Sequence, residues 1–130
     1  MNSEQNTLSA IFKNVIFSSE ESLLIESKFE KIQLKKGDIL LRAQETVYNQ
    51  YYVQSGCLRT YFIDTIGKEH TLQFAINDWW ISDFTAFFTT SSSILNIECI
   101  QDATLYKISK KDLDSLFLRI PKLDTFFRKN

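Results

Sequence analysis

Residues 50–76 read QYYVQSGCLRTYFIDTIGKEHTLQFAI, a run in which β-branched and aromatic residues alternate with turn formers. A Ser-Gly pair lies between Gln50–Gln54 and Leu58–Asp64 and is typical of a tight β-hairpin. Thr65–Lys68 then separates the second of these strands from a third, Glu69–Ile76. The run therefore predicts short strands joined by tight turns.

Short strands continue on both sides of this run. Lys31–Lys35 alternates apolar and polar residues, and Lys36–Asp38 predicts a turn before a strand at Ile39–Leu41. Further strands are predicted downstream, at Trp79–Ile81, Ile94–Ile100 and Ala103–Ile108. Strands at a spacing of roughly eight to twelve residues indicate an all-β sandwich or barrel.

Helices are predicted at both ends of the chain. Apolar residues at helical spacing predict a first helix over about Thr7–Phe17. Ser18 followed by Glu21 forms a capping box that opens a second helix. Another capping box lies at Ser109–Asp112, and the helix it opens ends at Pro121, which fits the first position of a further helix.

The helix that Pro121 begins carries an apolar face of Leu123, Phe126 and Phe127. The sequence stops at Asn130, after about two turns, and an isolated helix of that length is marginal in water. We expect either that the sequence is the N-terminal part of a longer protein or that a partner covers these aromatic side chains.

The composition is that of one cored domain, with 130 residues, 44% hydrophobic and 14% aromatic. Lys and Arg number 15 against 16 Asp and Glu, and the small positive excess lies after Ile100, where 7 basic residues face 4 acidic ones. Nonspecific binding to a phosphate backbone needs a basic surplus on one face. The chain is therefore not expected to bind nucleic acid by itself.

Two cysteines, Cys57 and Cys99, are predicted to be reduced core thiols, since they cannot supply a four-thiolate cluster or a four-ligand zinc site unaided. Residues 1–10 lack the basic and apolar regions of a signal peptide, and no apolar run approaches the roughly 20 residues of a membrane span. A cytoplasmic protein without membrane contact is expected.

Four short motifs occur in a fixed order along the chain, at Lys35–Asp38, Tyr52–Arg59, Gly67–Glu69 and Asp102–Ser109. Together with the order of predicted helices and strands, they resemble the sensor domain of the Crp/Fnr family of bacterial transcription regulators. The tandem Trp79-Trp80, with Ile97-Glu98 downstream, is most similar to the Bacteroidetes-type branch. The resemblance implies a mainly β fold: a double-stranded β-helix, the cyclic nucleotide-binding-like jelly roll, with flanking N-terminal and C-terminal helices.

The resemblance also implies a domain organisation and partners. Residues 1–120 would be the sensor domain, and residues 121–130 the start of a helix that joins two copies into a homodimer through Leu123, Phe126 and Phe127. In the family a helix-turn-helix domain follows and contacts DNA. That domain is missing from this sequence, so any DNA contact would be made only through it.

Cyclic nucleotide-binding members carry Gly-Glu at the start of a short helix and, about ten residues on, an Arg that pairs with the cyclic phosphate, followed by Ser or Thr. Alignment back from Ile108-Ser109 places Ser82-Asp83 at Gly-Glu, Ser93 at the Arg and Ile94 at the Ser or Thr. No Lys or Arg occurs between Asn77 and Tyr106. The sequence therefore predicts that cAMP and cGMP do not bind with useful affinity.

A small-molecule effector of another kind is the remaining candidate ligand. The candidate pocket comprises Phe74, Trp80, Ile81, Ser82, Asp83, Ser93 and Ile94. For Asp83, capping of a short helix at Phe84–Phe88 is favoured over ligand contact. The aromatic residues around it are expected to be core or lid residues rather than ligand-stacking ones.

The residue types in the sequence argue against an enzyme. His70 is the only histidine, whereas a cupin-type metal enzyme, which shares a similar roll, needs two or three histidines and a carboxylate around one ion. No catalytic triad and no Gly-rich phosphate loop can be assembled, and no cofactor is expected. The alternative to a regulator is a stand-alone β-roll module that binds a partner protein through its aromatic C-terminus.

Overall fold

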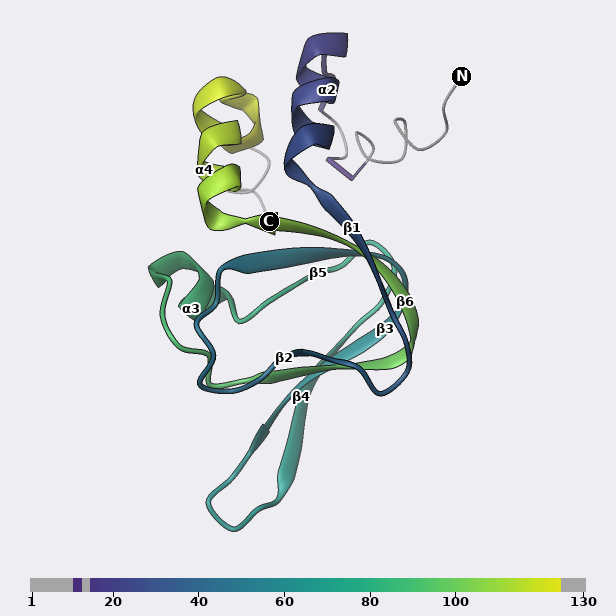
Figure 1. The fold of residues 1–130 in the computed structure, drawn as a ribbon, viewed down its shortest axis with the longest axis vertical. Helices are drawn as coiled ribbons and strands as arrows, with labels where there is room; N and C mark the ends of the chain where they lie inside the picture. Colours follow the sequence, from purple (N-terminus) through teal and green to yellow (C-terminus); the bar gives the residue numbers. More distant parts are fainter. Residues whose placement is uncertain (1–10, 13–14, 125–130) are drawn as a thin grey trace. The chain divides into compact units, whose positions relative to one another are not determined.

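The structure, a computed structural model, describes residues 11–12 and 15–124. In chain order its elements are α2 (Ser19–Lys28), β1 (Glu30–Leu34), β2 (Ile39–Leu41), β3 (Asn49–Ile63), β4 (Glu69–Ala75), β5 (Trp80–Ile81), α3 (Phe84–Thr89), β6 (Asn96–Ser109) and α4 (Lys110–Arg119) (Figure 1). Residues 31–110 form one unit, and the described residues on either side of that range form a second.

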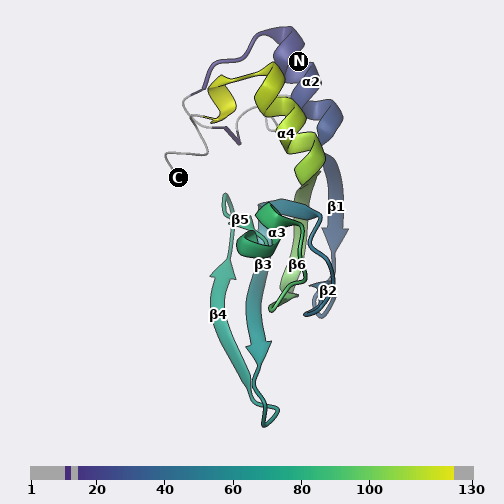
Figure 2. The same ribbon diagram turned by 90° about the vertical axis from the view of Figure 1, so that its left-hand side faces the viewer.

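The β unit is built around two long strands. The sheet order is β1-β6-β3-β4, and the short strands β2 and β5 pair with β6 and β3 respectively. β3 and β6 run side by side and antiparallel, with Leu58 opposite Cys99 and Thr60 opposite Ile97 (Figure 2). These four residues are buried and form part of the core. The predicted fold class, a mainly β jelly roll with flanking helices, is confirmed.

The hairpin predicted at Ser55-Gly56 is wrong, because β3 runs through this dipeptide without turning. The pairing of β3 with β6 is irregular here, with register shifts on both sides of Ser55 and again after Cys57. Gly56 has φ +99°, and a Cβ on it would lie 2.5 Å from the carbonyl oxygen of Asp102 and 2.6 Å from the Cβ of Ala103. The glycine therefore permits a close approach of two backbones. The two strands predicted at 94–100 and 103–108 likewise form one continuous strand, β6.

Gly56→Ala is expected to lower the free energy of unfolding by about 2–4 kcal/mol, from backbone strain at positive φ combined with overpacking. Gly67→Ala is the matched control, because Gly67 has φ +89° but open space around it. Its expected cost is about 1 kcal/mol, from strain alone. Urea unfolding of both variants measures the difference, and equal losses would mean that the close approach at Gly56 is not a constraint.

The β3–β4 hairpin is confirmed, with Ile63 opposite Glu69. One oxygen of Asp64 accepts the backbone N–H groups of Ile66 (3.0 Å) and Lys68 (2.9 Å). The other oxygen lies 2.8 Å from Nε2 of His70, a half-buried strand residue as predicted. The His70 ring also stacks on Phe62, with 4.7 Å between ring centroids. A single carboxylate thus organises the hairpin turn.

The hydrogen bond from His70 is the largest cause that holds the pKa of Asp64 below its usual 3.8, followed by the backbone N–H of Lys68. A lowered pKa stabilises the hairpin above pH 3.8, and this contribution is lost as pH falls through the folded-state pKa. His70→Gln is expected to raise the pKa of Asp64 towards 3.8. NMR titration of the Asp64 carboxyl carbon measures the change, and an unchanged pKa would contradict this assignment.

In the helical unit, α2 begins as predicted at a capping box. The Ser18 Oγ accepts the Glu21 N–H at 3.1 Å, and the Glu21 carboxylate accepts the Ser18 N–H at 2.8 Å. Lys122, just after Pro121, forms an ion pair of 2.9 Å with Glu21. α4 buries Leu113 and Leu116 and ends before Pro121, also as predicted. No helix in the described part of the chain is long and apolar enough to cross a membrane.

The helix predicted over about Thr7–Phe17 is wrong where the structure describes it, because residues 11–12 and 15–17 are not helical; the rest of that range lies outside the described residues. Phe12 is buried and packs against Phe17 and Phe29, with ring centroids 5.9 and 6.1 Å apart. Ile16 is 89% exposed. Phe12 and Phe17 thus belong to an aromatic cluster with Phe29, whereas Ile16 does not.

Candidate functional site

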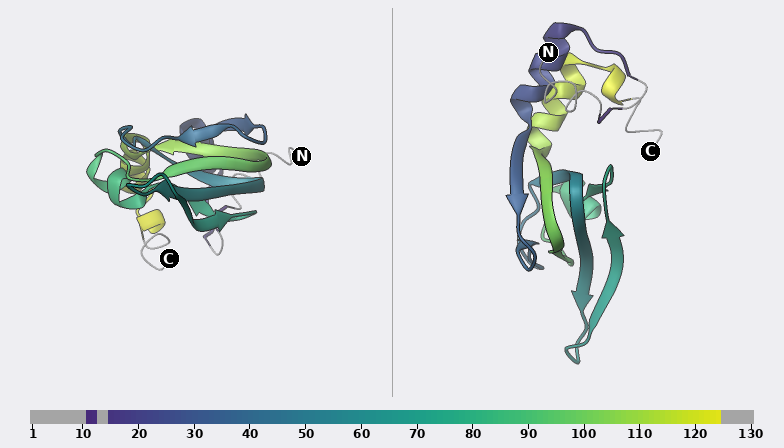
Figure 3. Two further views of the ribbon diagram at one scale, coloured as in Figure 1. Left: turned by 90° about the horizontal axis from the view of Figure 1, so that it is seen from below. Right: turned by 90° about the vertical axis from the view of Figure 1, so that its right-hand side faces the viewer.

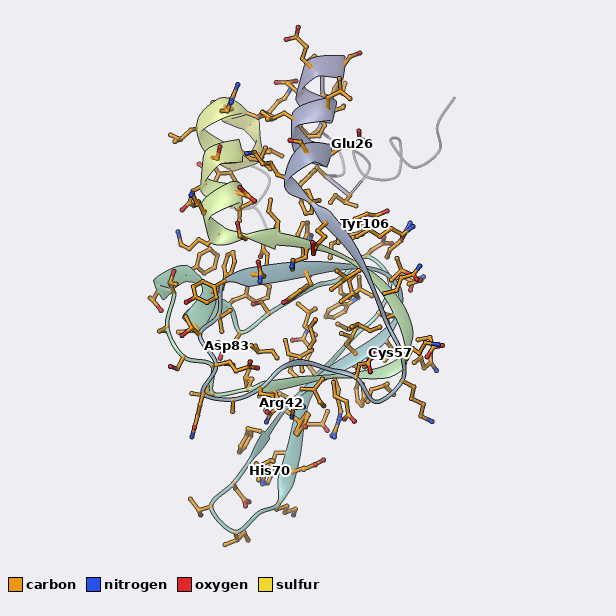
Figure 4. All side chains as sticks on the ribbon, in the orientation of Figure 1. Glu26, Arg42, Cys57, His70, Asp83 and Tyr106 are labelled. Atoms are coloured by element: carbon orange, nitrogen blue, oxygen red, sulfur yellow. The ribbon has the colours of Figure 1, made fainter. Side chains whose placement is uncertain are left out.

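The short strand β5 and the helix α3 position Ser82 and Asp83 between them. Ile81 is buried opposite Tyr51, and the next residue, Ser82, donates its hydroxyl to the carbonyl oxygen of Asn49 at 2.8 Å. Asp83 is the N-cap of α3, and its Oδ1 accepts the N–H of Ala86 at 3.2 Å (Figure 4). The predicted capping role of Asp83 is confirmed.

The second oxygen of Asp83 binds the loop that leads into β6. Oδ2 lies 3.0 Å from the Ser93 hydroxyl and accepts the N–H of Ile94 at 3.0 Å. The Ser93 oxygen in turn accepts the N–H of Leu95 at 3.0 Å, and its hydroxyl has the Leu95 carbonyl as a second acceptor at 2.9 Å. Asp83 is 6% exposed and Ser93 2%. We call Asp83 and its bonds to Ala86, Ser93 and Ile94 the Asp83 network.

No cation of the segment around this network faces the carboxylate, since residues 77–106 contain no Lys or Arg. Arg59, on the adjacent strand β3, is engaged elsewhere. Its guanidinium binds Glu98 and Glu69 at 2.8 Å each and lies 4.0 Å from the centre of the Tyr61 ring. Hydrogen bonding to Glu69, and then to Glu98, raises the pKa of Arg59 further above its usual value.

The structure brings together four of the predicted pocket residues, namely Ser82, Asp83, Ser93 and Ile94. Phe74 is separate: it lies opposite Arg59 on β4, which within the described residues pairs with β3 alone, and it is 55% exposed. Trp80 packs edge-on against Tyr52, with 5.2 Å between ring centroids.

The Tyr52 hydroxyl donates to Asp78, and this contact was not predicted. Burial is the main cause that raises the pKa of Tyr52, and the bond to Asp78 adds to it. The two residues are far apart in the sequence and follow no motif, so only the pairing of β3 with β5 reveals the contact.

The aromatic residues of α3 divide by helix face. Phe87 is fully buried, whereas Phe84 and Phe88 are 37% and 61% exposed and stack on each other. Ile94, next to the network, is 77% exposed. Of the three phenylalanines of α3, Phe87 is therefore the one that belongs to the core.

The residues predicted for dimerisation are described in part. Leu123 is fully buried, while Phe126 and Phe127 lie outside the described residues. Cys57 and Cys99 are free thiols, as predicted, but only Cys99 is a core residue, since Cys57 is half-buried. Burial is the largest cause that raises the pKa of Cys99. Residues 11–12 and 15–124 contain no group of three or more His, Cys, Asp and Glu side chains placed to hold a metal ion.

The fold of this chain is similar to the folds of several proteins of known structure. The sensor domain of the transcriptional regulator DNR from Pseudomonas aeruginosa has a TM-score of 0.81 at 17% identity, covering 98% of this chain and 88% of that one. The Catabolite Activator Protein of Thermus thermophilus has a TM-score of 0.78 at 18% identity, covering 92% of this chain and 55% of that one.

A third similar structure is the regulatory subunit of a cAMP-independent protein kinase A from Trypanosoma cruzi, bound to guanosine. It has a TM-score of 0.72 at 13% identity and covers 88% of this chain and 42% of that one. At such identities the likeness shows the fold alone. The chain thus spans only about half of the Thermus and Trypanosoma proteins.

No curated protein matches the sequence. The family described as cyclic nucleotide-binding domain matches residues 31–119, which include the whole Asp83 network. The chain therefore belongs to the cyclic nucleotide-binding domain family.

Proposed function

We propose that this chain is the effector-sensing and dimer-organising domain of a Crp/Fnr-like transcription regulator that does not respond to cAMP or cGMP. One observation carries the nucleotide part of the proposal: the Ser93 hydroxyl binds Asp83 where cyclic nucleotide-binding relatives place an arginine. The site that would hold a cyclic phosphate is occupied by the chain's own hydrogen bonds.

A cyclic phosphate is a single anion and needs a cationic partner in a water-poor site. Truncating one partner of a buried charge pair costs about 2–5 kcal/mol, enough to weaken a micromolar site to the millimolar range. Here the carboxylate of Asp83 adds repulsion, since like charges close together repel. Oδ2 of Asp83 already has two hydrogen-bond donors and Oδ1 has one, so a ribose hydroxyl could bind only at Oδ1 unless it displaced a donor from Oδ2.

The wider part of the proposal rests on the resemblance. Residues 1–120 would sense, and the helix that begins at Pro121 would join two copies and pass the signal to a DNA-reading domain that follows. An effector can shift such a helix only if it binds the two arrangements with different affinity. The protein would act in the bacterial cytoplasm, and the pair Trp79-Trp80 would place it in the Bacteroidetes-type branch.

The test of this wider part uses the product of the complete gene. If the gene continues past Asn130 with a helix-turn-helix and net positive charge, the purified protein is expected to bind its promoter as a dimer, equally with and without 1 mM cAMP, a concentration about 1,000-fold above a micromolar dissociation constant. Phe126→Asp with Phe127→Asp should abolish that binding, and Ile66→Asp, at an exposed hairpin turn, is the control. Binding that requires cAMP would overturn the proposal.

A further inference from the structure

β4 is an edge strand of the roll. It pairs with β3 on one side, and in the described part of the chain no strand lies on its other side. Two views show the β3–β4 hairpin extending away from the other strands (Figures 1 and 3). One row of backbone N–H and C=O groups of β4 therefore faces outward, and such a row is a template for pairing with another strand.

Large apolar side chains are exposed along this edge, with exposed fractions of 56% at Leu72, 55% at Phe74, 51% at Ile76 and 47% at Trp79. By contrast, Ala75 is fully buried, and Phe74 lies opposite Arg59 on the outer face. Natural sheets protect exposed edges with lysine, proline or other charged residues. Residues 71–77 contain none of these. This part of the edge is thus apolar and uncharged, and it has one irregularity, a register shift between Thr71 and Gln73 in the pairing with β3.

We propose that β4 pairs antiparallel with β4 of a second copy about a two-fold axis. A pairing centred on Gln73 places Leu72 of each copy opposite Phe74 of the other, and Thr71 opposite Ala75. Aromatic–aliphatic cross-strand pairs are favourable, and residues 71–75, which this register pairs with one another, carry no charge, so no like charges are brought into opposition. A strand can pair in this way with itself, since a two-fold interface uses the same patch on both copies.

The exposed area is sufficient for a weak dimer. Four large side chains that are each about half exposed offer on the order of 400 Å² of apolar surface per copy. With a polar rim, the interface would bury about 1,200 Å² in total, the lower limit for specific complexes. A patch of this size is within the range of about 300–600 Å² for the largest apolar patch of a typical monomer, and such patches often have a binding role. We therefore expect association at a protein concentration on the order of 100 μM.

Sedimentation equilibrium of the 130-residue chain between about 10 and 500 μM tests the proposal. The wild type should dimerise, and Leu72→Lys with Phe74→Lys should weaken association at least tenfold. Ile66→Lys, at a position 86% exposed in the hairpin turn, should leave it unchanged. Phe126→Asp with Phe127→Asp should also leave this contact unchanged, which separates it from helix-mediated association.

Two results would overturn the proposal: a wild type that stays monomeric, as expected if another segment or a different protein covers β4, or a dimer that survives the double lysine change. Should the double lysine variant not fold, as judged by circular dichroism, Gln73→Cys decides. This variant should form an intermolecular disulfide at residue 73 under oxidation, whereas Ser55→Cys, also at an exposed position, should not. Equal crosslinking of the two cysteine variants would contradict the proposed register.

Discussion

Asp83→Ala should lower the free energy of unfolding by about 2–4 kcal/mol. The loss of the N-cap accounts for about 1 kcal/mol. The remainder comes mainly from the Ile94 N–H, which loses its Oδ2 acceptor at 3.0 Å. The Ser93 hydroxyl loses the same acceptor but keeps the Leu95 carbonyl at 2.9 Å. Leaving a buried polar group without its partner costs about 1–3 kcal/mol.

Two variants control this prediction. Ser18→Ala removes the exposed N-cap of α2 and should cost only about 1 kcal/mol. Asp83→Asn keeps a capping oxygen but cannot offer acceptors on both sides, so it should fall between the two. Urea unfolding monitored by tryptophan fluorescence gives all three values. If Asp83→Ala costs no more than Ser18→Ala, the Asp83 network does not hold the loop to α3.

Restoring the family pattern should create a nucleotide site in this roll. The combined variant Ser82→Gly, Asp83→Glu, Ser93→Arg and Ile94→Ser replaces the Asp83 network with a cation and a carboxylate at the positions where nucleotide-binding relatives have them. Its affinity for cAMP is expected to exceed that of the wild type by at least about 100-fold, the equivalent of about 2.7 kcal/mol. Calorimetric titration measures the gain.

Ser93→Lys in the wild-type background is the matched control. It adds the charge without the planar fork that holds a phosphate through two bonds, so its gain should be much smaller. Equal affinities of the wild type and the four-residue variant would mean that the missing arginine is not what excludes the nucleotide.

Local sequence patterns predicted the elements that local chemistry determines. The capping box at Ser18 and the cap at Asp83 each involve residues three apart, and both were confirmed. The hairpin predicted at Ser55-Gly56 was wrong because a glycine with positive φ is suited both to a turn and to a close approach of two backbones. Only the approach of Asp102 and Ala103 distinguishes the two uses, and that approach is a tertiary contact.

The sequence predicted which residues form most of the candidate site but not the hydrogen bonds between them. Alignment with the family pattern placed Ser93 at the position of the arginine, and the absence of cations could be read directly from residues 77–106. The hydrogen bond between the Ser93 hydroxyl and Asp83 could not be predicted from the sequence, because Asp83 caps α3 whereas Ser93 lies in the loop before β6. Phe74 was included in the predicted pocket, but its side chain is exposed on β4.

Isothermal titration of cAMP, and separately of cGMP, into the wild-type chain tests the central claim most directly. With Ser93 in place of the arginine and three hydrogen-bond donors already on Asp83, no saturable heat is expected, which corresponds to a dissociation constant above about 1 mM. A dissociation constant below about 50 μM for either nucleotide would contradict the claim that this roll excludes the family's usual ligand.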